Sequence, residues 1–216
     1  MESKGWKWEE INEERWDIPA EEVYYLSYRW KDQGRLRVLD LGCGKGRHSI
    51  FFAKQGFEVY AIDISESGIE ILREKAGKEG LNINAISGDM LSLPYEDETF
   101  DSVLSYHTIY HTDKRGLEKA ISEVWRVLKR EGEFFVTLNS KFSKSFNNPN
   151  NIHLNDGTVI KKEGIEAGIP HYYVTREEIF DLMKYFKILT MKYVEEVIPR
   201  ESKKFLILAA KEEIRY

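Results

Sequence analysis

A glycine-rich loop is the first feature of this 216-residue sequence whose residue types and spacing could do chemistry. It reads DLGCGKGRHS over residues 40–49, with glycines at positions 42, 44 and 46. Because glycine has no Cβ, such a loop lets backbone amides approach a ligand closely. Phosphate, a dinucleotide and a cationic ligand are the three ligands to weigh. The backbone is expected to do the binding, with Lys45 a solvated side chain.

The residues around the glycines indicate which of these three ligands fits the loop. A phosphate-binding P-loop has Ser or Thr after its lysine, but Gly46 follows Lys45 here. A dinucleotide fingerprint has its third glycine where Arg47 stands, so a nicotinamide cofactor is the weaker alternative. Asp40, at the end of an apolar run, would repel a pyrophosphate. An acid in this place favours a ligand that carries an ammonium or sulfonium cation.

Strands and helices alternate around this loop, which predicts a parallel, doubly wound α/β sheet. Strands are expected at 37–41, 58–64, 82–89, 100–106 and 133–139, and helices at 47–56, 65–80 and 117–132. Two final strands, 187–198 and 203–213, should pair antiparallel across a short turn at 198–202. Ligands bind such sheets beyond the carboxyl ends of the strands. We expect one domain over residues 1–216.

Two segments flank this pattern. Residues 1–34 are polar with interleaved aromatics, which predicts a helical cap that packs its aromatic face on the domain or closes over a site. Residues 141–174 interrupt the alternation and should form an insertion with a hairpin, turning at Asn155-Asp156-Gly157. Thr175 and Glu178 then have the spacing of a helical capping box.

Four ordered motifs resemble those of the class I S-adenosylmethionine (SAM) dependent methyltransferases. VLDLGCGKGRHS resembles the first motif, EVYAIDIS the second, and SGDMLSLPYEDETFDSVLS the third and fourth. ISEVWRVLKREGEFFVTL resembles the approach to the fifth strand, with Lys-Arg-Glu-Gly where the family has Lys-Pro-Gly-Gly. The resemblance covers nearly the whole chain. It implies a seven-stranded Rossmann-like fold, SAM as methyl donor and S-adenosylhomocysteine as product.

The resemblance also assigns cofactor contacts residue by residue. Asp40 would hold the methionine ammonium, Asp63 the ribose hydroxyls and Asp89 the adenine amino group. The remaining expected contacts are Gly42, Cys43, Gly44, Gly46, Ile64, Met90 and Ser105. From the residues alone, Asp63 could instead cap a helix and Asp89 could serve a turn. Arg47 and His48 open the helix after the loop, where they could lie near the methionine carboxylate, and His48 could equally serve packing.

The histidines are the main indication of which residues would contact the methyl acceptor. All five fall in segments that should face the site, and His107 and His171 are the candidates for catalysis. Trp16, Tyr106, His153 and Tyr172 are the candidates for acceptor contacts. No spacing indicates a metal site. The sequence after the fourth strand is LSYHTIYH rather than Asn/Asp-Pro-Pro-Tyr/Phe, and the single cysteine lies in the glycine loop, which argues against nucleic-acid base methylation.

The amino-acid composition limits the classes of molecule that this chain is expected to bind. A net charge of -5 gives no general attraction for nucleic acid or an anionic membrane. The N-terminal residues contain no apolar core for a signal peptide, so a cytoplasmic location is expected. Nothing in the sequence indicates an oligomeric state. The expected function is methyl transfer to a small molecule; the alternatives are a protein or RNA substrate and a non-catalytic SAM-binding module.

Overall fold

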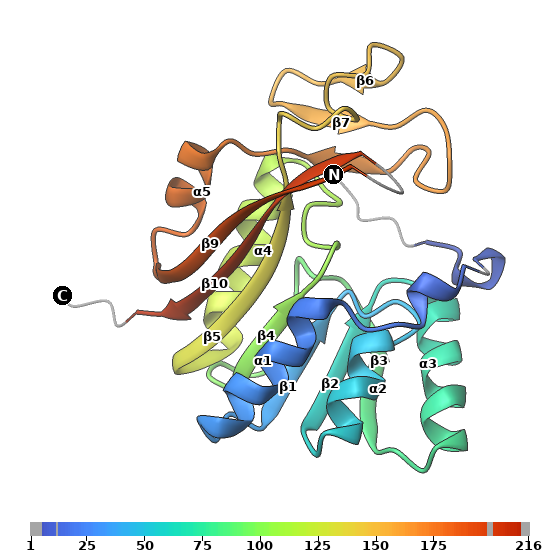
Figure 1. Ribbon diagram of the computed structural model, residues 1–216, viewed down its shortest axis with the longest axis vertical. Helices are drawn as coiled ribbons and strands as arrows, with labels where there is room; N and C mark the ends of the chain where they lie inside the picture. Colours follow the sequence, from blue (N-terminus) through green and yellow to red (C-terminus); the bar gives the residue numbers. More distant parts are fainter. Residues whose placement is uncertain (1–5, 12, 198–200, 213–216) are drawn as a thin grey trace.

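A seven-stranded sheet forms the centre of the computed structural model, which describes residues 6–11, 13–197 and 201–212 (Figure 1). The strand order is β3-β2-β1-β4-β5-β10-β9, and only β10 runs antiparallel to its neighbours. The strands are β1 Arg37–Leu41, β2 Glu58–Asp63, β3 Ile83–Ser87, β4 Phe100–Ser105, β5 Leu128–Asn139, β9 Phe186–Glu196 and β10 Ser202–Lys211. The predicted Rossmann-like sheet is confirmed; the turn expected before β10 includes residues 198–200, which lie outside the described residues.

Helices cover both faces of this sheet. Neighbouring residues on a strand point to opposite faces, and Val38 and Leu39 accordingly belong to two different core clusters. Val38 packs with α1 and α2, whereas Leu39 packs with α4 and α5. The helices are α1 Glu21–Asp32, α2 Arg47–Lys54, α3 Glu66–Lys78, α4 Lys114–Val127 and α5 Arg176–Leu182. No helix among the described residues is long and apolar enough to cross a bilayer.

The helix predicted at 117–132 is wrong at both ends. It begins earlier, at Lys114, because the Asp113 side chain accepts a hydrogen bond from the Gly116 amide at 2.8 Å. It ends at Val127, and residues 128–132 begin β5. Leu128 has φ -72° and ψ 137°, and it pairs with Phe100 of β4. Leu128 is buried in β5, and because a buried leucine fits the apolar pattern of a helix as well as that of a strand, its hydrophobicity does not reveal where the helix stops.

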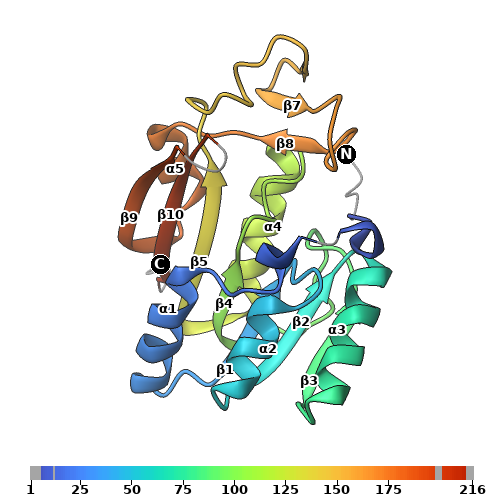
Figure 2. The same cartoon turned by 45° about the vertical axis from the view of Figure 1, so that its right-hand side comes forward.

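The insertion forms a separate three-stranded sheet beyond the carboxyl ends of the main strands (Figure 2). Its antiparallel strands are β6 Ile152–His153, β7 Thr158–Ile160 and β8 Pro170–Tyr172. The hairpin predicted at residues 155–157 is confirmed, and Gly157 has φ 90° there. The third strand was not expected. The Tyr172 amide donates to the Tyr110 carbonyl at 2.9 Å, which ties the insertion to the main body.

The N-terminal cap is only partly the helix that was predicted. Two 3-10 helices, η1 Trp8–Glu10 and η2 Glu14–Trp16, precede α1, while residues 1–5 and 12 lie outside the described part. Pro19 explains the break, because a residue before proline disfavours the helical conformation. The Glu133 carboxylate of β5 then accepts hydrogen bonds from the Arg29 and Trp30 side chains of α1. The cap is thus fixed to the sheet by a buried acid.

Candidate active site

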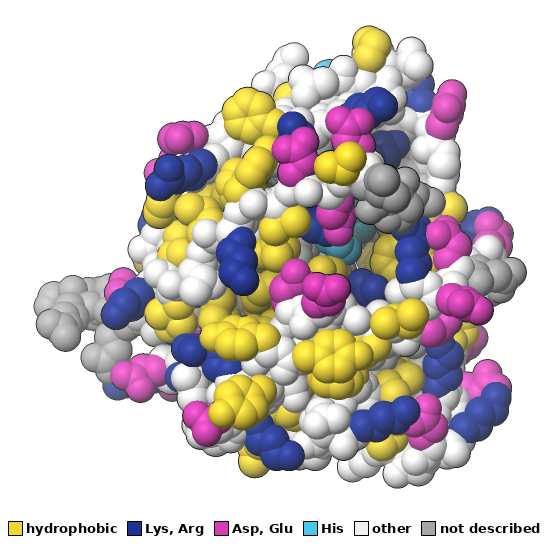
Figure 3. Space-filling view, in the orientation of Figure 1, with side chains coloured by type: hydrophobic (Ala, Val, Ile, Leu, Met, Phe, Trp, Pro, Cys, Tyr) yellow, Lys and Arg dark blue, Asp and Glu magenta, His cyan; other side chains and the backbone are white. Residues whose placement is uncertain are grey.

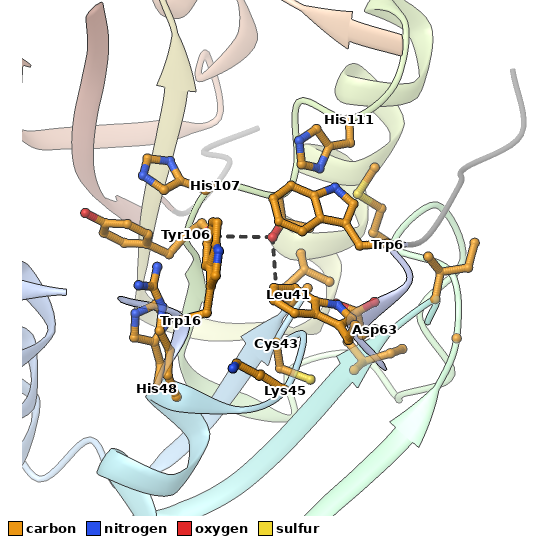
Figure 4. A pocket seen from close by; sticks show the side chains of 18 of the residues that line it. Trp6, Trp16, Leu41, Cys43, Lys45, His48, Asp63, Tyr106, His107 and His111 are labelled. Carbon is orange, nitrogen blue, oxygen red and sulfur yellow. Dashed lines mark hydrogen bonds between the residues drawn. The ribbon is translucent and has the colours of Figure 1, made fainter. Parts of the chain in front are cut away.

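A cleft lies at the carboxyl ends of β1, β2 and β4 (Figure 4). Seen from outside, it opens in a hollow where histidine side chains are visible (Figure 3). Its wall comes from the loops after these strands and after β3, from the start of α2 and from the cap. The lining residues are Trp6, Trp8, Trp16, Leu41, Gly42, Cys43, Lys45, Arg47, His48, Ile62, Asp63, Ile64, Gly88, Asp89, Met90, Tyr106, His107, Thr108 and His111.

The glycine loop has a backbone that other residues would not allow. Gly42 and Gly44 have φ of 75° and 53°, in the left-handed region. A side chain at Gly42 would also place its Cβ 1.9 Å from Thr108 Cγ2. The Thr108 hydroxyl donates to the Gly42 carbonyl at 3.0 Å, so the loop after β4 holds the loop after β1. Bare backbone therefore forms this part of the cleft wall.

Asp63 and Asp89 both lie on the wall, as expected. Asp63 Oδ2 accepts from the Gly44 amide and Oδ1 from the Ser65 amide, both at 2.8 Å. Burial raises the pKa of Asp63 above its ordinary value, although these amides oppose the shift. Ser65, not Asp63, caps α3, because its hydroxyl accepts from the Gly68 amide at 3.3 Å. The Asp63 carboxylate is therefore free of the helix-capping role.

Asp40 lies behind the loop and does not line the cleft. Its side chain is buried and accepts a 2.6 Å hydrogen bond from the Ser49 hydroxyl. Burial raises the pKa of Asp40 to about 6, and the Ser49 hydrogen bond and the Arg47 charge offset only part of this shift. An ionised Asp40 is therefore a charge held close beneath the loop.

The expectation that Lys45 has a solvated side chain is wrong. It is 7% exposed, and its ammonium pairs with Asp17 of the cap at 2.9 Å. Asp17 also pairs with Lys75 of α3. Two cations, one from the glycine loop and one from α3, therefore pair with the cap residue Asp17.

Three tryptophans of the cap close one side of the cleft. The ring centroids of Trp6 and Trp8 lie 5.1 Å apart, and Trp16 meets both edge-on. Trp8 lies against the glycine loop, since a Cβ on Gly44 would come 2.3 Å from its ring. Arg47 donates to the Arg15 carbonyl at 3.0 Å, and its guanidinium lies 5.1 Å from the Trp16 ring centroid. The cap is part of the cleft wall.

Imidazole and phenol groups form the wall opposite the loop (Figure 4). His107 has φ 58°, and its amide donates to the Thr137 hydroxyl at 2.7 Å. Burial holds the pKa of His107 well below its usual value, so the ring is neutral. His48 is buried, accepts from the Ala20 amide and meets the Tyr106 ring edge-on. His48 therefore both packs against the cap and faces the cleft.

The structure separates the predicted residues into two groups. His107, Trp16, Tyr106 and most of the cofactor candidates line the cleft. Those that do not line it are Asp40, Gly44, Gly46, Ser105, His153, His171 and Tyr172. Tyr172 lines a second groove beside α4 and α5, and His153 is exposed on β6. Thr108 is a wall residue that the sequence did not single out, whereas His111, one of the five histidines expected to face the site, does line the cleft.

Comparisons with known proteins agree with this geometry. Residues 38–132 match the family model described as a methyltransferase domain. Sarcosine/dimethylglycine N-methyltransferase of Aphanothece halophytica is 31% identical over 144 residues, covering 61% of this chain and 51% of the relative. The chain spans between about a third and a half of the curated relatives it matches.

Solved structures extend the likeness to most of the chain. The PH0226 protein from Pyrococcus horikoshii OT3 has a TM-score of 0.68 and 27% identity, covering 91% of this chain and 94% of that one. The 1,6-didemethyltoxoflavin-N1-methyltransferase of Burkholderia thailandensis, solved with S-adenosylhomocysteine bound, has a TM-score of 0.66 at 17% identity, covering 88% and 78%. Residues 38–132 thus match a methyltransferase-domain family, and the sheet order over most of the chain is the fold of solved methyltransferase structures.

Proposed function

We propose that this chain transfers a methyl group from SAM to a small-molecule acceptor. The observation that carries this proposal is the division of the cleft wall into two unlike sides (Figure 4). One side is the Gly42 backbone with the carboxylates of Asp63 and Asp89, the other is the imidazole and phenol groups after β4, and the cap indoles close the cleft. The first side suits a polar, cationic cofactor, and the second suits a flat or partly apolar acceptor.

The residues on the loop side fit the cofactor. Each Asp63 oxygen accepts one backbone amide and keeps a further lone pair, so the carboxylate can accept from two adjacent ribose hydroxyls. Asp89 lies on the same wall and would accept from the adenine amino group, with Ile64 and Met90 as apolar neighbours. Asp40 would attract the methionine ammonium through its charge behind the loop.

The acceptor must be held in line with the methyl group. SAM supplies this methyl on a positively charged sulfur, which is already an activated leaving group. Positioning alone can lower such a barrier by about 7–11 kcal/mol. Where the acceptor must lose a proton, His107 is the base within the cleft. Its Nδ1 lies 3.3 Å from the Thr137 hydroxyl, and when Nδ1–H donates there, Nε2 is free to accept a proton.

A small acceptor fits this site better than a macromolecule. The cap tryptophans lie in the wall of the cleft, and the insertion sheet lies beyond the strand ends above it (Figure 2). A protein or RNA substrate would need an open groove and, for RNA, a basic surface, whereas the net charge is -5. The sarcosine/dimethylglycine and 1,6-didemethyltoxoflavin enzymes are named for small-molecule substrates, which agrees with this preference.

Calorimetry and a transfer assay test the proposal. S-adenosylhomocysteine should bind the wild type and NAD should not. Asp63→Asn should weaken binding strongly, while Asp181→Asn, an exposed acid on α5, should leave it unchanged. A panel of amines, phenols and thiols is then incubated with methyl-labelled SAM. Cofactor binding without transfer to any acceptor would favour the non-catalytic SAM-binding module, and binding of NAD alone would refute the proposal.

A further inference from the structure

Two histidines and a glutamate from distant parts of the chain meet at the edge of the cleft. His111 lies between β4 and α4, Glu166 between β7 and β8, and His171 on β8. Each imidazole Nε2 lies 3.3 Å from a different Glu166 oxygen. The two rings lie 4.7 Å apart between centroids. The group therefore links the insertion to the main body, and His111 also lines the cleft.

The hydrogen bonds of His171 fix what its second nitrogen offers. Its Nδ1 lies 2.9 Å from the Ile169 carbonyl, and a carbonyl can only accept, so Nδ1 carries the proton. In the neutral ring, Nε2 then presents a lone pair, and a Glu166 oxygen 3.3 Å away presents another. Two acceptors that face each other in a buried place need a cation or a proton between them.

The geometry favours a cation over a proton. If either Nε2 carried a proton for Glu166, a hydrogen bond to the carboxylate would be expected. Instead, both Nε2 atoms are buried, and their 3.3 Å distances to the Glu166 oxygens are longer than the roughly 2.7–2.9 Å of a charge-assisted hydrogen bond. One ligand atom from each of the three side chains lies within 4.8 Å of the other two. Ligands of a tetrahedral zinc ion lie about 3.4 Å apart, so small side-chain shifts would complete the site.

We propose that His111, Glu166 and His171 bind a divalent metal ion of the zinc type. Two imidazoles and one carboxylate are a set that zinc uses where it keeps a fourth position open. The hydrogen bond from His171 Nδ1 to a backbone carbonyl is the usual support for a metal-bound histidine. The side chains of His111 and Glu166 are 12% and 18% exposed, so an ion can reach the group. Bound there, it would fasten the insertion to the edge of the cleft.

A substitution at Lys161 tests this proposal, because it should change metal affinity in the direction opposite to a substitution at Glu166. Its ammonium pairs with the same Glu166 oxygen that faces His171. A metal ion must share that carboxylate with the ammonium or displace it. Removing the lysine charge should therefore strengthen metal binding, whereas removing the glutamate charge should weaken it. A merely structural salt bridge would not give opposite effects of this kind.

The experiment measures zinc affinity by competition with a chromogenic chelator, on full-length protein first stripped of metal. The wild type should bind one equivalent of zinc. Glu166→Gln and His111→Gln should each bind zinc at least about tenfold more weakly than the wild type. Lys161→Met should bind zinc more tightly than the wild type. His153→Gln, an exposed histidine of the same insertion, is the matched control and should bind as the wild type does. Circular dichroism without metal shows whether each variant is folded. If His111→Gln is not folded, Glu166→Gln alone is enough to test the metal site.

Cobalt replacement adds a spectroscopic readout that does not depend on methyl transfer. Cobalt bound by the wild type should show the intense visible bands of a four-coordinate ion, and these should be lost in Glu166→Gln. Two results would overturn the proposal: a wild type that binds no stoichiometric zinc, or zinc affinity that is the same in Glu166→Gln and the wild type. Because SAM is absent from both measurements, failure here leaves the proposed methyl transfer untouched.

Discussion

Replacing Asp40 by asparagine should stabilise the folded protein while weakening cofactor binding. The Asp40 carboxyl is 1% exposed, and burial raises its pKa to about 6 against an ordinary value of 3.8. The Ser49 hydroxyl and the Arg47 guanidinium favour the ionised form but do not outweigh burial. At neutral pH the folded protein therefore holds an ionised carboxylate in surroundings that disfavour it.

The sign and size follow from the two pKa values. Between pH 3.8 and about 6 the folded protein binds more protons than the unfolded chain, so its stability falls as pH rises. Above this window the ionised group costs about 3 kcal/mol, because one pKa unit corresponds to about 1.4 kcal/mol. Asparagine has a similar volume and can still accept from Ser49. It carries no charge, so Asp40→Asn should recover up to this amount.

Urea unfolding of the two proteins without cofactor measures this effect. The free energy of unfolding of the variant minus that of the wild type should grow by about 2 kcal/mol from pH 4.5 to pH 7.5. Other titrating groups are common to both proteins and cancel in the difference. Calorimetry should show weaker binding of S-adenosylhomocysteine to the variant. A stability difference that stays constant across this pH range would refute the reasoning.

Three further substitutions test other parts of the structure. Gly68→Ala should displace Trp8, because the new Cβ would lie 2.7 Å from its ring, and a red shift of tryptophan emission would report this. His107→Gln should keep the affinity for S-adenosylhomocysteine and slow transfer about 100-fold or more if the acceptor must lose a proton; an unchanged rate would remove its role as base. Glu133→Gln should cost about 2–4 kcal/mol in urea unfolding, because the Arg29 charge loses its buried partner.

The glycine loop and the alternation around it could be predicted because both depend on residues close in sequence. Gly42 and Gly44 adopt positive φ where the spacing required close approach, and the acid at position 63 ends its strand at the cleft. The end of α4 could not be predicted, since a buried Leu128 satisfies the apolar pattern of a helix and of a strand equally.

Ion pairs and ligand clusters depend instead on which distant segments meet. Lys45 reads as a surface residue in sequence, yet the cap places Asp17 beside it and buries it. Glu166 lies in a polar stretch with no motif, and only the antiparallel pairing of β7 with β8 returns the chain so that His171 meets it. His111 and His171 were both among the histidines expected to face the site, but Glu166, which joins them, was not singled out. Sequence spacing alone therefore gave no sign of this group.

The loop and the cap are linked by the same short segment. Lys45, Arg47 and His48 belong to the glycine loop and the start of α2, and all three bind residues 15–20 of the cap. The cap also contacts the glycine loop directly, since Trp8 lies against Gly44. A ligand that shifts the loop must therefore also alter the contacts of the cap, and closing the cap must favour one arrangement of the loop. The position of the glycine loop and the position of the cap are therefore coupled through these contacts.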